Sequence, residues 1–193
     1  MTGPVPPPRL LVVGLGGPDR GDDAVGPVVA RRFAALALPG IRVIEREDPT
    51  SLIDLWGGYD VAVVIDAVRS TGVPGSLVVL ESGGDAGPLP EDAWARTGRG
   101  GTHAFGLAAS VELSRALDRL PRRVVLVGIL AAGFEPGEGL SQPVDAAVGR
   151  AVDAVVAVLW ETGELGGISV ADADPDGPAR PLVAVRRVPG VTP

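Results

Sequence analysis

The chain has 193 residues, a formal net charge of −7, 46% hydrophobic residues and no cysteine. This length suits one globular domain, and the negative charge argues against unaided binding to nucleic acid. All 17 basic residues are arginine, which excludes lysine Schiff-base chemistry and a Walker A loop, and the lack of cysteine excludes disulfides and thiolate sites. No signal-like leader or membrane-length apolar run appears, so we expect no membrane partner, and the cysteine-free acidic composition fits the cytoplasm.

The first half of the chain alternates between strand and helix patterns. Four prolines within residues 1–8 predict an extended lead rather than a helix. Continuous apolar runs predict buried strands at 10–13 and 61–65, with an alternating strand at 41–45. Helical spacing of apolar residues follows the first strand up to Leu36, and a short helix is expected at 51–56. This alternation predicts a parallel sheet with helices on both faces.

The second half of the chain adds one strand of opposite direction. Its expected elements are a strand at 76–80, a loop at 81–101, a helix at 102–117, a strand at 122–130 and a helix at 143–161. The Pro74-Gly75 turn before the strand at 76–80 is too short for a crossover helix, so that strand should run antiparallel to its neighbour. We therefore expect one α/β domain over 9–161, followed by a mostly unpacked Gly/Pro-rich tail at 162–193.

Two further expectations concern helix starts and the tail. Thr50 or Ser51 is expected to cap the short helix at 51–56, and Thr102 the helix at 102–117. The short apolar run ending at Val185 is the one part of the tail that we expect to be able to dock on the domain.

Gly14-Leu15-Gly16 after the first strand is similar to the start of a dinucleotide-binding fingerprint. Asp19 stands where the third glycine of that fingerprint would be, so the motif is incomplete. Glu45 has the position of a ribose-binding acid, but Asp22 and the aspartate after it would repel a pyrophosphate. A nucleotide-cofactor oxidoreductase is therefore the weaker alternative, and a tight turn is the better interpretation of the glycines.

Three titratable positions are candidates for a site. Asp22 and Asp23 both suit a helix N-cap, and Asp22 is the better candidate for that role, which leaves Asp23 available to a site. Asp66 ends the third apolar run, at the sheet edge where open α/β sheets bind ligands. His103 is the one histidine, and its position at a helix start favours the neutral ring. Two carboxylates and one imidazole suit a borderline transition metal.

Several motifs in order resemble the hydrogenase maturation endopeptidases, which trim the large subunit of nickel–iron hydrogenases. They are GLGGPDRGDDAVG at 14–26, VVIDAVRS and PG within 63–75, H-x-x-G-L from His103, and VGI followed by FEPGEGLS within 127–141. The resemblance spans about 9–161 and implies a three-layer α/β/α sandwich around a five-stranded mixed sheet with one antiparallel strand. It also implies that Asp23, Asp66 and His103 bind nickel and form the catalytic site.

The resemblance implies an aspartic-type endopeptidase that removes the C-terminal extension of a hydrogenase large-subunit precursor after nickel insertion. The nickel would be presented by that precursor. The first motif departs from the family pattern at Gly17, where asparagine is usual, and at Asp23, where glutamate is frequent. A non-catalytic factor that binds nickel or the precursor is the main alternative, and how the peptide bond is attacked stays open between metal activation and a carboxylate base.

Overall fold

The computed structural model describes residues 8–69, 71–84, 106–161 and 185–187. The strands of this part are β1 (Leu10–Leu15), β2 (Ile41–Arg46), β3 (Val61–Val68), β4 (Leu77–Ser82), β5 (Arg123–Leu130) and β6 (Val185–Arg187). The α-helices are α1 (Val25–Ala34), α2 (Leu52–Leu55), α3 (Leu107–Ala116), α4 (Gln142–Asp145) and α5 (Val148–Glu161). Two 3₁₀ turns, η1 (Gly21–Ala24) and η2 (Pro49–Ser51), precede α1 and α2.

The strands form one mixed sheet in the order β2-β1-β3-β5-β4-β6. β1 pairs in parallel with β2 and β3, and β3 pairs in parallel with β5, whereas β4 runs antiparallel to β5. The five-stranded mixed sheet with one antiparallel strand is thus confirmed. The antiparallel direction of β4 follows from the link at Pro74-Gly75, which is too short for a crossover helix. β6 extends the sheet from the tail by three residues, parallel to β4.

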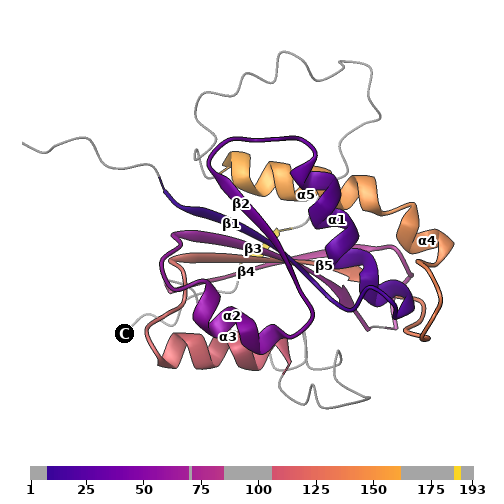
Figure 1. The fold of residues 1–193 in the computed structure, drawn as a ribbon, viewed down its shortest axis with the longest axis horizontal. Coiled ribbons are helices and arrows are strands. Elements are labelled where there is room, and N and C mark those ends of the chain that lie inside the picture. Colours follow the sequence, from indigo (N-terminus) through magenta and orange to yellow (C-terminus); the bar gives the residue numbers. More distant parts are fainter. Residues whose placement is uncertain (1–7, 70, 85–105, 162–184, 188–193) are drawn as a thin grey trace, which may run out of the picture.

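Helices cover both faces of the sheet, which confirms the three-layer arrangement (Figure 1). α1 and α5 pack on one face with Val63 and Ile65 of β3, while α2 and α3 pack on the other with Val64. Successive residues of a strand point to opposite faces, so a strand buried on both sides must be apolar throughout. The continuous apolar runs of β1, β3 and β5 follow from this requirement.

Several element boundaries differ from those that the sequence predicts. α1 ends at Ala34 rather than Leu36, and the single helix expected at 143–161 is divided into α4 and α5. Ser51 is the residue before α2, as predicted, but its side chain makes no capping hydrogen bond there. Asp48 instead caps the preceding 3₁₀ turn η2 by accepting a hydrogen bond of 2.8 Å from Thr50 N. The lead at 1–7, loop residues 85–101 and the Thr102 cap lie outside the described residues.

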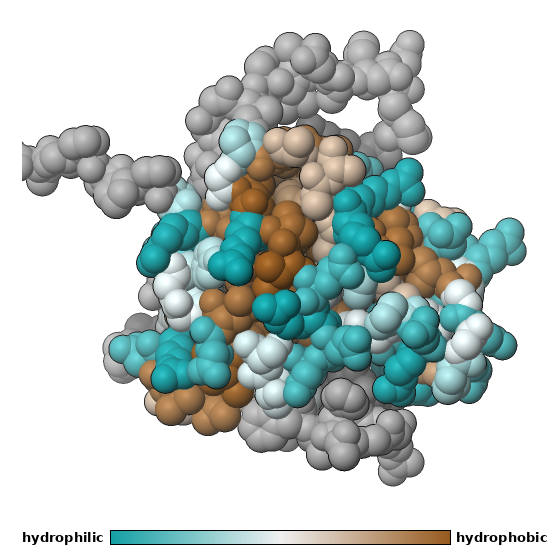
Figure 2. Space-filling model, viewed as in Figure 1, coloured by the Kyte–Doolittle hydropathy of each residue, from teal (hydrophilic) through white to brown (hydrophobic). Residues whose placement is uncertain are grey.

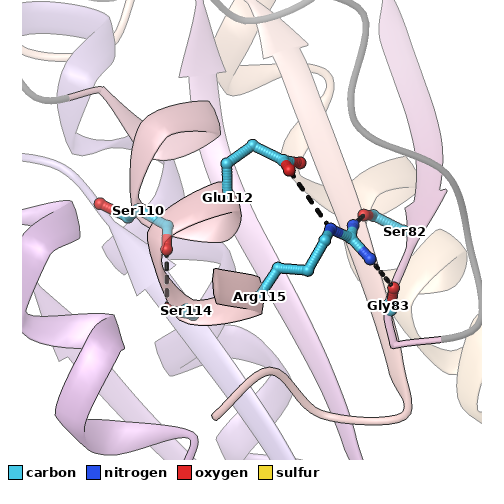
Figure 3. A network of polar contacts seen from close by, with 6 residues as sticks. All are labelled: Ser82, Gly83, Ser110, Glu112, Ser114 and Arg115. Carbon is cyan, nitrogen blue, oxygen red and sulfur yellow. Dashed lines mark hydrogen bonds and ion pairs between the residues drawn. The ribbon is translucent and has the colours of Figure 1, made fainter. Parts of the chain in front are cut away.

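α3 is fixed at its C-terminal end by a polar network with the end of β4 (Figure 3). Arg115 donates hydrogen bonds to the Gly83 carbonyl and, over 3.0 Å, to Ser82 Oγ, and it pairs with Glu112 over 3.2 Å. Ser82 lies beside Val124, at the beginning of β5. The C-terminal end of α3 therefore lies at the amino edge of the parallel strands, and its N-terminal end is directed toward their carboxyl edge.

Polar side chains cover much of the face seen in Figure 2, with apolar surface left near the edge strand β2 and helix α1. Ile41 and Val43 of β2 are partly buried against the core on this side. Among the helices that the structure describes, none combines the length and apolar character needed to cross a membrane.

Candidate active site

The turn after β1 brings η1 directly onto the end of that strand. Gly16 has φ of +133°, and a Cβ there would lie 1.9 Å from the carbonyl oxygen of Asp23, so only glycine fits. A Cβ on Gly26 would lie 2.2 Å from Leu15 O and 2.6 Å from Ile65 O. The backbone leading into α1 is therefore pressed against the ends of both β1 and β3. This confirms the tight turn that the glycines predict.

Asp23 is held in this turn by a backbone donor. Its Oδ2 accepts a hydrogen bond of 2.8 Å from Gly17 N, and its side chain is partly buried. A Cβ on Gly17 would lie 3.3 Å from the same oxygen. The hydrogen bond fixes the orientation of the carboxylate, as outer partners do for side chains that bind a cation.

Asp66 lies on β3, which pairs in parallel with β1. Its side chain is buried, with 5% of its surface exposed. The strand does not end at Asp66, because pairing with β5 continues to Val68. Since Gly14 pairs with Ile65, Asp66 is level with the last residues of β1, and η1 contacts β3. Asp23 and Asp66 therefore approach the same sheet edge from adjacent strands.

This edge is the place where the strand order reverses. From β1 the chain goes to β2 on one side through α1, and from β2 to β3 on the other side through α2. α1 and α2 cover opposite faces of the sheet (Figure 1). Open α/β sheets bind their ligands outside the carboxyl ends of the strands at such a reversal. The fold itself thus marks the position of Asp23 and Asp66 as a candidate site.

His103 lies outside the described residues, so its proximity to the two aspartates stays a prediction. The described chain resumes at Gly106, the residue before α3, whose N-terminal end is directed toward the carboxyl edge. Leu107 packs in the same cluster as Leu15 and Val68, which end β1 and β3. Within the described residues, no three His, Asp or Glu side chains come together as a metal site.

Asp22 has a different role from the cap that the sequence predicts. Neither η1 nor α1 has a side-chain cap. Asp22 is 1% exposed, and its carboxylate accepts hydrogen bonds from Ala132 N (2.7 Å), Gly133 N (3.2 Å), Ser141 N (2.7 Å) and Ser141 Oγ (2.9 Å). One carboxylate therefore closes both ends of the segment 132–141, which follows β5.

The loop 132–141 is joined to the first motif by backbone contacts as well. Asp22 N donates to Gly133 O over 3.1 Å, and Gly137 N donates to Asp19 O over 2.9 Å. Within the loop, the ring of Phe134 lies 4.3 Å from the guanidinium carbon of Arg69. The motif FEPGEGLS is visible in the sequence, but nothing in it indicates that Asp22 is its partner. Residues more than a hundred positions apart form this part of the site.

The chemistry of the site follows from its two carboxylates. Both are held at fixed positions, one buried in a strand and one oriented by a backbone N–H. Carboxylates in such a place attract a cation or accept a proton from water, and an imidazole beside them would complete a donor set for a divalent transition metal. Glu45, in contrast, forms an ion pair of 3.2 Å with Arg31 of α1, which does not favour a ribose-binding role.

The chain is similar in sequence and in structure to hydrogenase maturation proteases. The family model for hydrogenase maturation proteases matches residues 47–158. The chain is 26% identical over 159 residues to the hydrogenase 2 maturation protease of Escherichia coli K12, covering 80% of this chain and 93% of that protein. The structure of the hydrogenase maturating endopeptidase HybD from E. coli superposes with a TM-score of 0.63 at 25% identity, over 80% of this chain and 94% of HybD.

An archaeal structure extends this similarity. The hydrogenase 2 maturation peptidase from Thaumarchaeota archaeon SCGC_AB-539-E09 is 31% identical, with a TM-score of 0.56, over 78% of this chain and 97% of the peptidase. The family model spans more than half of the chain and includes the positions of Asp66 and His103. The chain therefore belongs to the hydrogenase maturation protease family.

Proposed function

We propose that the protein is an endopeptidase that removes the C-terminal extension of a nickel–iron hydrogenase large-subunit precursor after nickel insertion. The observation that carries this proposal is the approach of Asp23 and Asp66 to one sheet edge, at the reversal of strand order, in a member of the maturation protease family. A protease needs groups that act on a peptide bond and on water. The two carboxylates are such groups at the place where this fold binds ligands.

Nickel enters this proposal as part of the substrate. Asp23, Asp66 and His103 would contact the nickel of the precursor and so distinguish a loaded precursor from an empty one. The donor set fits this role, because imidazole binds nickel well and two fixed carboxylates supply charge. The backbone hydrogen bond from Gly17 N to Asp23 supplies the kind of outer contact that orients a metal ligand. We place this reaction in the cytoplasm, as the cysteine-free acidic composition predicts.

Two routes for hydrolysis follow from the same geometry. In both, the water oxygen joins the carbonyl carbon, the C–N bond breaks, and a proton moves to the leaving amine. In an aspartic-type route, Asp23 or Asp66 takes the water proton as a general base. In the other route, the nickel of the precursor polarises the carbonyl or the water. Precursors loaded with a different divalent metal distinguish the routes, because kcat depends on the metal only in the second.

The decisive test follows the mass of the precursor. Nickel-loaded and nickel-free precursor are incubated with the protein, and intact-mass spectrometry measures loss of the extension. We expect cleavage of the loaded form alone, and none by Asp66→Ala. Asp153→Ala is the matched control, because Asp153 is an exposed acid on α5. Equal cleavage of both precursors, or full activity of Asp66→Ala, would contradict the proposal.

The main alternative is a factor that binds the precursor or its nickel without cutting it. A stable complex with the loaded precursor, no change in precursor mass, and loss of nickel affinity in His103→Ala would favour that alternative. The nucleotide-cofactor alternative predicts a rise in melting temperature with NAD or FMN. The ion pair of Glu45 with Arg31 does not favour this alternative, because it occupies the acid that would bind the ribose.

A further inference from the structure

Most arginines of the described chain have a partner, and the exceptions are unevenly placed. Of the arginines whose side chains the structure describes, all but Arg20, Arg32 and Arg69 have a hydrogen bond, an ion pair or another electrostatic contact, and the contact of Arg69 is with an aromatic ring. Arg32 lies exposed on α1. Arg20 lies in the turn between β1 and η1, and Arg69 directly follows β3, so both lie at the sheet edge that carries Asp23 and Asp66.

Arg20 lies beside Asp23. A Cβ on Gly17 would lie 3.2 Å from Arg20 Cδ and 3.3 Å from Asp23 Oδ2, so the arginine stem and the carboxylate flank the same glycine. Arg20 is partly buried, and its carbonyl accepts a hydrogen bond of 3.1 Å from Asp23 N. The turn that fixes Asp23 thus also places the stem of Arg20 close to the candidate site.

Arg69 is placed by an aromatic ring. It is the residue after β3, three positions beyond Asp66, and its side chain is exposed. Its guanidinium carbon lies 4.3 Å from the centre of the Phe134 ring. A guanidinium that lies over an aromatic ring keeps its N–H groups in its own plane, where they can still donate to another group. Because Asp22 holds both ends of the loop that carries Phe134, this contact has a rigid support.

The chemistry of the guanidinium group indicates which kind of ligand these arginines can bind. The fork of guanidinium N–H groups matches a carboxylate, and the resulting bonds are among the stronger hydrogen bonds in proteins. In a chain with a net charge of −7, these two cations have no acceptor within the described ranges and lie at the edge that carries the two site carboxylates, so they are available to an anionic ligand. A peptide that is removed from a C-terminus always ends in an α-carboxylate, and it can carry acidic side chains as well.

We propose that Arg20 and Arg69 bind a carboxylate of the precursor's C-terminal extension and so determine which peptide is accepted. This inference rests on the proposed endopeptidase function and adds the chemistry of the recognised segment. Asp23 and Asp66 act at the scissile bond, and the two arginines hold the segment that leaves. Both arginines then contribute to binding of the substrate in the ground state and in the transition state, so their loss raises KM more than it lowers kcat.

The test uses nickel-loaded precursor in three forms: the natural extension, the same extension ending in a carboxamide, and an extension with its Asp and Glu changed to Asn and Gln. For the wild-type protein, we expect one of the two altered forms to raise KM about tenfold, which identifies the source of the carboxylate. Arg69→Gln and Arg20→Gln should raise KM for the natural form by about the same factor and remove the difference between the forms. Arg32→Gln is the matched control, and it should keep the wild-type KM for the natural form and the difference in KM between the forms.

Two outcomes would overturn the inference. One is equal KM for all three precursor forms with the wild-type protein. The other is an unchanged preference for the carboxylate in Arg69→Gln, whose exposed side chain can be replaced without disturbing the fold. Arg20→Lys is the second variant at the partly buried position, where it keeps the charge but lacks the fork, and we expect it to recover only part of the affinity.

A binding measurement separates this inference from the proposed function. The labelled extension peptide, as carboxylate and as carboxamide, is titrated with each variant and followed by fluorescence anisotropy. Cleavage of loaded precursor by the wild-type protein without any carboxylate preference refutes the inference and leaves the endopeptidase function intact. Arginine-dependent binding of the carboxylate peptide without any cleavage refutes the endopeptidase function and leaves the recognition site intact.

Discussion

Replacing Asp22 by asparagine tests whether one carboxylate holds the loop 132–141 in place. The substitution keeps the size of the side chain and changes one oxygen to an NH₂ group. Asp22 Oδ2 accepts from Ala132 N, Gly133 N and Ser141 Oγ, and Oδ1 accepts from Ser141 N. An asparagine that keeps its oxygen at the Oδ2 position directs its NH₂ at Ser141 N, donor against donor.

The expected loss follows from these four hydrogen bonds. Breaking one bond to a buried carboxylate costs about 1.5–3 kcal/mol, and the other three become neutral bonds that are weaker by about 1 kcal/mol each. Removing a buried charge relieves a desolvation cost of a few kcal/mol, which offsets part of this loss. We therefore expect Asp22→Asn to lower the free energy of unfolding by about 2–4 kcal/mol, or the melting temperature by roughly 5–15 °C.

Urea unfolding gives the free energy, and amide hydrogen exchange locates its cause. The amides of Ala132 and Ser141 should exchange faster in Asp22→Asn, because each donates to the carboxylate over 2.7 Å. Asp19→Asn is the matched control: it removes the same charge from an exposed side chain and should change stability by less than about 0.5 kcal/mol. The reasoning is refuted if Asp22→Asn is as stable as Asp19→Asn, or if both amides keep their exchange rates.

Three further predictions concern the site, the turn and the tail. Asp66→Asn should lower the rate of precursor cleavage by about 100-fold or more while circular dichroism shows an intact fold; activity within tenfold of wild type would contradict its role. Gly16→Ala should cost about 3 kcal/mol or more in thermal unfolding, because its Cβ would meet the Asp23 carbonyl, whereas Gly57→Ala points into open space and should cost less than about 1 kcal/mol. Removal of 162–193 takes away a three-residue edge strand and should lower stability by less than about 2 kcal/mol; failure to fold would place the tail inside the domain.

The architecture is predictable from the sequence because each central strand carries its own signal. Residues 10–13 and 61–65 are apolar at every position, as strands buried on both faces must be, and β1 and β3 occupy these positions. The direction of β4 also follows from local information, since the link at Pro74-Gly75 leaves no room for a crossover. With strand directions and alternation given, the placement of Asp66 at the carboxyl edge follows.

The roles of the polar residues are less predictable, because their partners are distant in sequence. The cap expected from Asp22 is a local rule, but four donors from 132–141 satisfy its carboxylate instead. The same limit applies to Arg69, whose ring partner Phe134 comes from another element. Asp48 shows the opposite case, because its cap is a local interaction with Thr50 N. The predicted cap position is too late in the chain, since a 3₁₀ turn precedes the helix and Asp48 caps that turn.

The aspartate doublet shows how a short motif divides structural and functional roles between neighbours. In a 3₁₀ turn, successive side chains point about 120° apart, so Asp22 and Asp23 cannot face the same surroundings. Asp22 turns inward to bind the loop after β5, and Asp23 lies against Gly17 at the sheet edge. Each needs a carboxylate for a different reason: the first because four donors converge on it, the second because we expect it to meet a cation. Asparagine at the first position should therefore act on stability, and asparagine at the second on cleavage.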